Sequence, residues 1–313
     1  MMDDAVADRV GGSLLGLALG DAFGAPHEGG ILERALWSLL GKRNGKWRWT
    51  DDTQMSIDVA ESLVACGGVD QDDLARRFAA SYRWSRGYGP GAAKVLKRIR
   101  GGQPWEVASR SVYPEGSFGN GGAMRAPVVG LFFANASDDE IADAARRTAA
   151  VTHGHPLGRD GAVLIAMATA LASNDGSSLS VVERLCECPL GQEFQARLHK
   201  VKEWVEAGTL ASPRNVVVEL GNGIAAVKSC VTAVYLALAF RSRLFEDLLG
   251  HAVELRGDVD TIAAMAGAIW GAARGADALP EKLLQQLEQR EKLESLARKL
   301  AETILAEGGA RMS

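Results

Sequence analysis

The sequence has little of what marks nucleic-acid-binding, membrane or secreted proteins. It contains no run of Lys or Arg, and its formal net charge is −4, which argues against a nucleic-acid partner. The apolar run 14–19 is too short to span a bilayer, and no later apolar stretch is both long and uncharged. The first residues are acidic, whereas a signal peptide begins with basic ones. We therefore expect a cytoplasmic protein with neither a membrane nor a nucleic acid as its partner.

Cysteine is also scarce. The four cysteines, Cys66, Cys186, Cys188 and Cys230, form no CxxC pair. The segment Cys186-Glu187-Cys188 lacks the second pair of ligands that a zinc site of this kind requires. We expect reduced structural thiols, as in most intracellular proteins.

Apolar residues with helical spacing are abundant. Hydrophobic residues make up 47% of the 313 residues and charged residues 24%, so a large core can form and disorder is not expected. Met55, Val59 and Leu63 share one face of a helix expected over 51–65. Alternating strand patterns, repeats and linkers are absent from the sequence, which favours a single all-α domain over residues 1–313. The expected helices cover 11–20, 51–65, 72–84, 92–100, 128–133, 138–148, 160–172, 224–240 and a segment that begins at 261.

Small residues are concentrated in the first and last of these helices, which implies close contacts with neighbouring helices. They are Gly12, Gly16 and Ala18 in the first, and Ala264, Gly267, Ala268, Gly271 and Gly275 in the last. Leucines at helical spacing predict one amphipathic C-terminal helix over 281–306, folded back on the body. The span 186–213 has no legible pattern.

Two acidic clusters stand at the starts of expected helices. Asp51 and Asp52 are flanked by threonines, and the sequence Gly257-Asp258-Val259-Asp260-Thr261 opens a second apolar helix late in the chain. Hard oxygen ligands of this kind suit Mg²⁺ or Mn²⁺ rather than zinc or copper. Acidic side chains also stabilise a helix start without any metal, so capping is the alternative for either cluster alone. Together, the clusters predict a metal pair bound between two helix starts.

A run of small residues from Gly119 to Arg125 opens a further helix. Its exposed backbone N–H groups could hold phosphates, although a plain turn is the alternative. The run is neither a Walker loop nor a dinucleotide fingerprint, because no Gly-Lys-Ser/Thr follows it and no strand precedes it.

Three other polar residues are candidates for a ligand site. His153 and His155 lack a third nitrogen or sulfur ligand and make a poor zinc site. We expect instead that one of the two histidines forms a hydrogen bond to a ligand or caps a helix. Glu28 follows Pro26 on an irregular segment, where it could act as a base or a metal ligand, or be a surface glutamate.

Five segments occur in an order that identifies a family. They are Gly20-Asp21-Ala22-Phe23-Gly24-Ala25-Pro26-His27-Glu28, Thr50-Asp51-Asp52-Thr53, Gly119-Asn120-Gly121-Gly122-Ala123-Met124-Arg125, Thr152-His153 and Gly257-Asp258-Val259-Asp260-Thr261. The series resembles the ADP-ribosylglycohydrolase family, which includes the dinitrogenase reductase-activating glycohydrolase, over roughly residues 11–280. Two more segments, 86–91 and 220–226, resemble the ADP-ribosylserine hydrolases more than the arginine-specific members.

The resemblance implies an orthogonal all-α bundle with two Mg²⁺ or Mn²⁺ ions in a central cleft. The implied metal ligands are Thr50, Asp51, Asp52, Asp258, Asp260 and Thr261. Glu28 would lie on a mobile flap beside the metals as the catalytic acid or base. The implied substrate-binding residues are Ser117, Phe118, Gly119, Asn120, Gly121, Gly122 and Met124 around the diphosphate and distal ribose, with Phe118 on the adenine side, and His153 at the nucleotide. Phe118 replaces a common tyrosine, and Arg256 replaces a usual glycine.

The function that the resemblance implies is hydrolysis of the bond between ADP-ribose and a modified protein side chain. O-linked serine is favoured as the acceptor, and arginine stays open. A metal pair can orient ribose hydroxyls and activate water, where most glycosidases use two carboxylates. The alternatives are hydrolysis of another ADP-ribosyl conjugate, such as an ester or nucleotide, and a catalytically silent, crystallin-like relative. We expect a monomer that acts on ADP-ribosylated proteins or small ADP-ribosyl conjugates.

Overall fold

The computed structural model describes residues 2–28, 37 and 41–311, and it confirms the all-α fold. Two long antiparallel helices lie at its centre: α1 (Met2–Gly24) and α15 (Val259–Arg274). Their backbones touch, because a Cβ atom on Gly16 would lie 2.3 Å from the carbonyl oxygen of Gly267. Gly12 meets Gly271 in the same way, 2.4 Å from its carbonyl oxygen. The close contacts predicted from small residues are thus confirmed.

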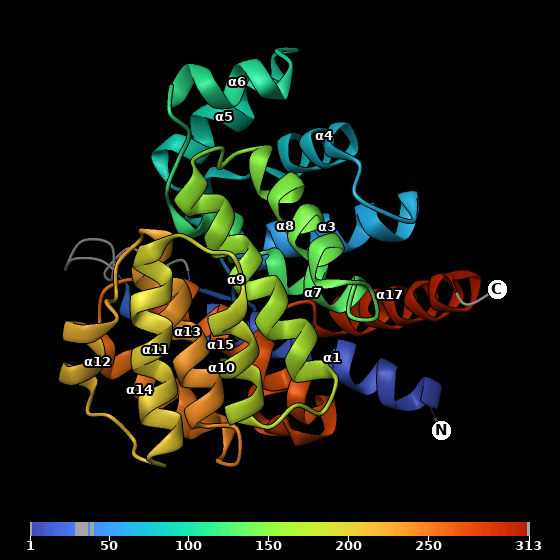
Figure 1. Cartoon of the computed structure of the whole chain (residues 1–313). Helices are drawn as coiled ribbons and strands as arrows, with labels where there is room; N and C mark the ends of the chain where they lie inside the picture. The colour runs from blue at the N-terminus through green and yellow to red at the C-terminus, as the bar shows by residue number, and fades with distance from the viewer. Residues whose placement is uncertain (1, 29–36, 38–40, 312–313) are drawn as a thin grey trace.

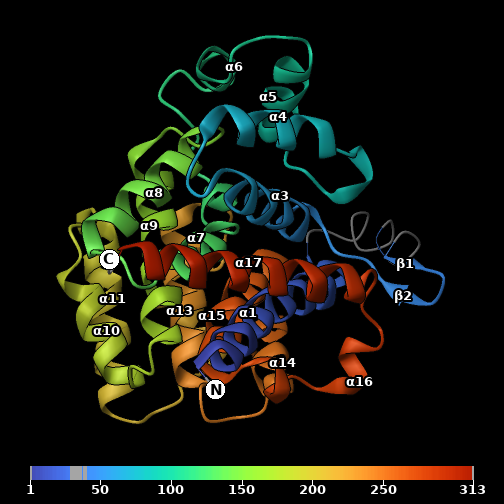
Figure 2. The same ribbon diagram turned by 90° about the vertical axis from the view of Figure 1, so that its right-hand side faces the viewer.

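Other helices enclose this pair (Figures 1 and 2). Those nearest to it are α3 (Asp51–Cys66), α7 (Ala126–Phe132), α9 (Pro156–Ser173), α13 (Ala226–Ala239), α14 (Phe245–Leu255) and α17 (Arg290–Arg311). Helices α13 and α15 are buried along most of their length, as their apolar composition requires.

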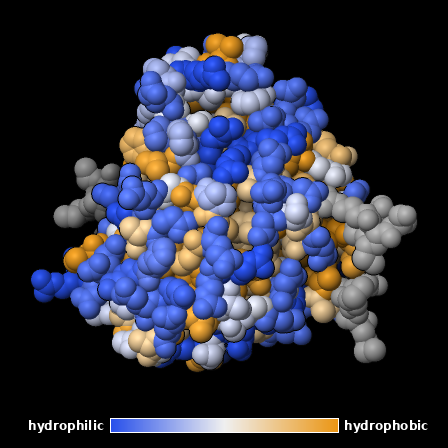
Figure 3. Space-filling view, viewed as in Figure 1, coloured by the Kyte–Doolittle hydropathy of each residue, from blue (hydrophilic) through white to orange (hydrophobic). Residues whose placement is uncertain are grey.

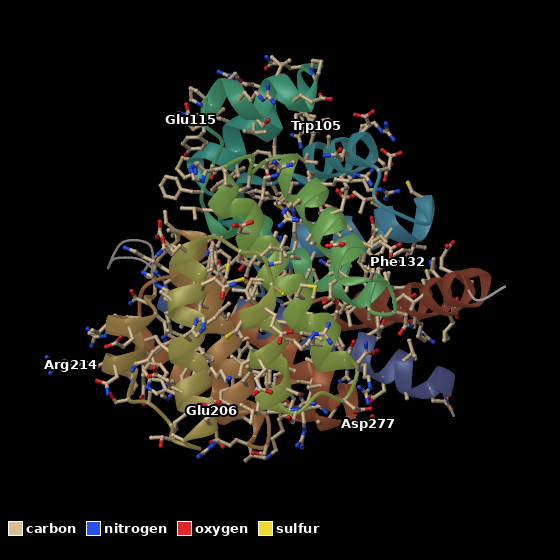
Figure 4. All side chains as sticks on the ribbon, in the orientation of Figure 1. Trp105, Glu115, Phe132, Glu206, Arg214 and Asp277 are labelled. Carbon is tan, nitrogen blue, oxygen red and sulfur yellow. The ribbon has the colours of Figure 1, made fainter. Side chains whose placement is uncertain are left out.

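The remaining helices form two outer groups. One group projects at the top of both ribbon views and comprises α4 (Gln71–Ser81), α5 (Pro90–Arg100) and α6 (Trp105–Val112), with α8 (Asp138–Ala150) beneath it. The other comprises α10 (Ser178–Glu187), α11 (Gln192–Glu206) and α12 (Pro213–Glu219). Short elements complete the fold: η1 (Ala25–His27), η2 (Trp84–Arg86), η3 (Asn120–Gly122), η4 (Ala276–Ala278) and α16 (Glu281–Leu284). Figure 4 labels Trp105 and Glu115 in the upper group, at the opposite end of the molecule from Glu206 and Asp277.

Several sequence-based boundaries need correction. The first helix begins at Met2 rather than Gly11, and the side chain of Asp8 on its added turns accepts the backbone N–H of Ala276 at 2.8 Å. Helices α6, α10, α11, α12 and α14 were not predicted. In α11 the buried Phe194, Leu198 and Val201 recur at the i, i+4, i+7 spacing of an amphipathic helix, so the sequence did contain a signal for this helix.

The C-terminal helix predicted over 281–306 is wrong as a single element. It is divided into α16 and α17 at Gln289, whose φ of 49° is left-handed. The intervening backbone pairs with β2 (Lys46–Trp47) instead of continuing a helix: Trp47 N–H donates to Gln286 at 2.6 Å, and Glu288 N–H donates to Trp47 at 3.0 Å. Strand β2 and β1 (Lys42–Arg43) form a short antiparallel hairpin that the sequence did not predict.

The surface in Figure 3 is mainly hydrophilic, with apolar residues scattered between polar ones. Among the described residues, no helix is both long enough and apolar enough to cross a membrane.

Candidate active site

The core helix pair brings three helix ends to one point. Because α1 and α15 run antiparallel, the last turn of α1 lies against the first turn of α15, and a Cβ on Gly24 would be 2.5 Å from the Cα of Asp260. The start of α3 joins them there. A cavity of about 210 Å³ opens at this junction. Its described lining residues are Glu28, Asp51, Asp52, Met55, Gly87, Gly89, Pro90, Gly91, Ala92, Tyr113, Ser117, Gly119, Asn120, Gly121, Met124, His153, Ile224, Asp258, Asp260 and Thr261.

Carboxylates from the three helix ends converge in two overlapping groups. One oxygen from each of Asp21, Asp52 and Asp260 lies within 4.8 Å of the others, and the same holds for Glu28, Asp258 and Asp260. Asp260 belongs to both groups, so the two groups are adjacent. The sequence prediction that two distant acidic clusters meet is confirmed by this geometry.

The carboxylates of Asp21, Glu28, Asp51, Asp52, Asp258 and Asp260 form an acidic wall, and no described lining residue balances its negative charge. Burial raises the pKa of Asp51 to about 8, with the charges of Asp21, Glu28 and Asp258 adding to the effect. Burial, with the charge of Glu28, also raises the pKa of Asp258 to about 7. No lysine or arginine occurs among the described lining residues.

One carboxylate oxygen of the wall is left without a partner. Oδ2 of Asp52 is buried and accepts no hydrogen bond from any described residue. Burial and the neighbouring carboxylates raise the pKa values of Asp52 and Asp260 well above the ordinary range. A buried oxygen-rich cluster with an orphaned carboxylate oxygen fits hard divalent cations.

Asp21 is a site residue that belongs to the first of the five family segments but was given no role from the sequence. It is fully buried near the end of α1 and accepts the backbone N–H of Thr50 at 2.9 Å. It also accepts the N–H and hydroxyl of Thr53 at 3.0 and 2.5 Å. Burial raises its pKa to about 6. Asp21 therefore fixes the start of α3 against α1, and its position as the one charged residue in the segment 10–24 was the available signal.

The six implied metal ligands are not equivalent in the structure. Asp51, Asp52, Asp258, Asp260 and Thr261 line the cavity, whereas Thr50 does not. Thr50 instead caps α3, because its hydroxyl oxygen accepts the Asp52 N–H at 3.2 Å. The start of α3 therefore has both a capping residue, Thr50, and a member of the carboxylate cluster, Asp52.

Glu28 lines the cavity from the segment after η1, and it is partly exposed. Residues 29–36, which follow it, lie outside the described part of the chain, so the prediction that Glu28 lies on a mobile flap stays a prediction. Arg256 is exposed and does not line the cavity.

The opposite wall is the glycine-rich segment 117–124, which is tied to the segment 224–226. The N–H of Asn120 donates to Ile224, and the N–H of Ala226 donates to Phe118, each at 3.0 Å. The amide of Asn120 donates to Ser229 at 3.0 Å and also to Asp258, which joins this glycine-rich wall to the acidic wall.

Most of the predicted substrate-binding residues lie on this wall. Ser117, Gly119, Asn120, Gly121, Met124 and His153 line the cavity, whereas Phe118 and Gly122 do not. The Phe118 ring is 54% exposed and packs edge-on against His155, with ring centroids 5.9 Å apart. Gly122 lies beneath the wall, where a Cβ would be 2.9 Å from that of Ala149.

A buried ion pair that was not predicted from the sequence holds the backbone just before α3. Arg86 and Glu288 are in direct contact, with side chains only 10% and 7% exposed. Arg86 also donates to the carbonyl of Trp49 at 2.7 Å, and Glu288 accepts the Trp49 N–H at 3.1 Å. The pair links the C-terminal segment to the residues directly before the acidic cluster.

Comparisons with known proteins agree with this architecture. A model of the ADP-ribosylglycohydrolase family matches residues 2–309. ADP-ribosylhydrolase ARH3 of Danio rerio is 34% identical over 334 residues, which cover 93% of this chain and 90% of that protein. ADP-ribosyl-[dinitrogen reductase] glycohydrolase of Rhodospirillum rubrum is 28% identical over 321 residues, 99% of each chain. A solved structure described as an ADP-ribosylglycohydrolase-related protein complex superimposes with a TM-score of 0.71 at 28% identity, covering 96% of this chain and 99% of that one.

Proposed function

The chain belongs to the ADP-ribosylglycohydrolase family and is a hydrolase of glycosyl bonds, and we propose that it releases ADP-ribose from modified protein side chains. The observation that supports this substrate is the cavity itself, which joins an unbalanced acidic wall to a glycine-rich wall. The first suits metal ions, and the second presents backbone and small side chains to a diphosphate. Both walls come from one chain, so residues 1–313 would form a single catalytic unit that needs no second copy.

The residues present fit two divalent cations, Mg²⁺ or Mn²⁺. Asp51, Asp52, Asp258, Asp260 and Thr261 would hold them, with Thr50 supplying a further oxygen if it leaves its capping position. When bound, such a metal pair lowers the pKa of water and orients the vicinal ribose hydroxyls. Asp21 would keep the start of α3 in register with α15.

Glu28 is the proposed catalytic acid or base. It lines the cavity from an irregular segment, whereas the aspartates belong to helix ends and would be engaged by the cations. Water would add to the anomeric carbon as the bond from that carbon to the side-chain oxygen breaks. Glu28 would take a proton from the water or give one to the leaving oxygen. The products are ADP-ribose and the unmodified side chain.

Serine is the favoured acceptor. Both segments that resemble the serine hydrolases reach the cavity, through Gly87, Gly89, Pro90 and Gly91 of one and Ile224 of the other. The alternatives are hydrolysis of another ADP-ribosyl conjugate and a catalytically silent protein. Against the second, the sequence contains every acidic residue that the family resemblance implies as a metal ligand.

The test is ADP-ribose release from matched peptides modified on serine or on arginine, with Mg²⁺, with Mn²⁺ and with a chelator. We expect release from the serine peptide that stops with the chelator. Release from the arginine peptide alone would overturn the acceptor, and release that persists in chelator would overturn the metals. If ADP-ribose binds but neither peptide reacts, protein de-ADP-ribosylation is wrong and the alternatives take its place.

A further inference from the structure

Arg125 is a fully buried cation that forms no ion pair with any described carboxylate. Its guanidinium lies 4.6 Å from the centre of the Phe78 ring and donates to the carbonyls of Gly121 and Thr148, at 2.8 and 3.1 Å. Burying a charge with neutral partners is costly, which suggests that Arg125 has a task beyond packing. It also has two longer contacts, to the carbonyl of Ala149 at 3.5 Å and to Sδ of Met55 at 3.8 Å. A shorter hydrogen bond, to the hydroxyl of Thr152 at 2.9 Å, indicates the task.

The Thr152 hydroxyl connects Arg125 to His153. A guanidinium can only donate, so the oxygen of Thr152 accepts from Arg125. The hydroxyl proton then needs an acceptor. Within the described structure, the one other group in hydrogen-bond contact with this hydroxyl is Nδ1 of His153, at 2.7 Å. Thr152 is 3% exposed, so an unpaired hydroxyl proton would be unfavourable.

This bond determines which ring nitrogen of His153 carries hydrogen. Nδ1 can accept from Thr152 only if it is unprotonated, and a neutral imidazole then has its proton on Nε2. Burial and the charge of Arg125 lower the pKa of His153 to about 3, so the doubly protonated ring is not populated near neutral pH.

The Nε2 side of the ring lies at the glycine-rich wall. A Cβ added to Gly121 would be 2.8 Å from Nε2, and one added to Gly119 would be 3.5 Å away. His153 lines the cavity, and no described residue accepts a hydrogen bond from Nε2. Because Arg125 also holds the Gly121 carbonyl, one guanidinium orients both the glycine backbone and the histidine beside it.

We propose that Arg125 and Thr152 hold His153 as the neutral Nε2–H tautomer, and that this N–H donates a hydrogen bond to an oxygen of bound ADP-ribose. The second half rests on the proposed function. His153 contacts the ligand, whereas Arg125 and Thr152 are positioning residues. A protonated Nε2 can neither remove a proton nor ligate a metal, so towards the ligand this nitrogen acts only as a donor.

The tautomer is measured first, without ligand. Long-range ¹H–¹⁵N correlation spectra of protein labelled at its five histidines distinguish the two ring nitrogens, and H153Q assigns the signals. We expect an unprotonated Nδ1 and a protonated Nε2 in the wild type. T152V removes the hydroxyl at nearly constant volume and should leave a mixture of tautomers, while T152S should retain the wild-type pattern.

Binding is measured next, by calorimetry with ADP-ribose and Mg²⁺. T152V should bind five- to tenfold more weakly, as expected for loss of one oriented hydrogen bond, and T152S should bind like the wild type. T169V is the matched control, because Thr169 is equally buried and its hydroxyl donates only to Ile165 within α9. It should change neither the tautomer nor the affinity.

Three outcomes would overturn the inference. Protonated Nδ1 in the wild type contradicts the relay, whether or not the enzyme is active. Wild-type affinity in T152V, with its tautomers mixed, contradicts the positioning role. Absence of ADP-ribose binding by the wild type contradicts the donation together with the proposed function. The ligand-free spectrum separates this last failure from a failure of the relay.

Discussion

The two walls of the cavity differ in how their polar groups are balanced. On the acidic wall, carboxylates repel one another and Oδ2 of Asp52 has no described partner. At the glycine-rich wall, Arg125 donates hydrogen bonds to the carbonyl of Gly121 and the hydroxyl of Thr152. The Asn120 amide donates to the hydroxyl of Ser229. We therefore expect bound cations to stabilise the acidic wall, whereas the described hydrogen bonds of the glycine-rich wall are made within the protein. Substitutions on the two walls should therefore differ in their effects on ADP-ribose release, metal binding and stability.

Neutralising the acidic wall should abolish turnover and stabilise the metal-free protein. In D260N, loss of a shared carboxylate should lower ADP-ribose release by at least about a hundredfold. Thermal melting in chelator should nevertheless occur at a higher temperature than for the wild type, because one buried negative charge is removed. The exposed D139N serves as the control and should change neither quantity. Near-normal release by D260N would contradict the metal assignment.

Adding one carbon to the glycine-rich wall should impair binding without affecting the acidic wall. A Cβ at Gly121 would lie 2.6 Å from Cε1 of His153, so G121A must displace the ring. We expect ADP-ribose affinity to fall about tenfold, in line with one lost hydrogen bond, while stabilisation by Mg²⁺ is retained. G223A is the control, since a Cβ there meets nothing within 4 Å. Equal affinities of G121A and G223A would show that this wall is adaptable rather than preorganised.

Removing the buried ion pair between Arg86 and Glu288 should disturb the acidic wall indirectly. E288Q keeps an oxygen for the Trp49 N–H but leaves Arg86 buried without its anionic partner, which should cost about 3 kcal/mol of unfolding free energy. Turnover should fall only several-fold, since the cavity residues are unchanged. E281Q, at an exposed ion pair with Arg290, should show no measurable change in denaturant unfolding. Equal unfolding free energies of E288Q and E281Q would mean that the Arg86–Glu288 ion pair does not stabilise the fold.

The pH dependence of stability should differ with and without metal. The pKa values of Asp51, about 8, and Asp258, about 7, exceed the value near 3.9 of an unfolded aspartate, so the native state binds more protons between about pH 4 and pH 8. Stability of the metal-free protein should therefore decrease as pH rises through this window. Bound Mg²⁺ should remove most of the decrease, because it stabilises the ionised carboxylates. Parallel melting curves in Mg²⁺ and in chelator would contradict this.

Local chemistry made the acidic and glycine-rich segments predictable. Asp51, Asp52, Asp258 and Asp260 stand at recognisable helix starts, so their types and flanking residues predict both caps and ligands. Close packing of α1 and of α15 against neighbouring helices was likewise predicted from their small residues, whereas the contact of these two helices with each other was not.

What sequence reasoning missed depends on tertiary contacts between distant residues. Asp21 acquires its role from hydrogen bonds to residues 29 and 32 positions later. The break before α17 exists because the 286–288 backbone pairs with Trp47, some 239 residues away. Likewise, the tautomer of His153 depends on Arg125, which precedes Thr152 by 27 positions. No local pattern contains such information.

The backbone contact between α1 and α15 has a consequence for how the catalytic cluster can vary. Since no side chains separate the helices at Gly12, Gly16 and Gly20, their axial offset cannot be adjusted by repacking. A slip of one helical turn would move Asp21 past Asp260 by about 5.4 Å, more than the separation within their carboxylate group. Substitutions deep in the core can thus act as active-site mutations at a distance, and core and catalytic cluster are constrained to evolve together.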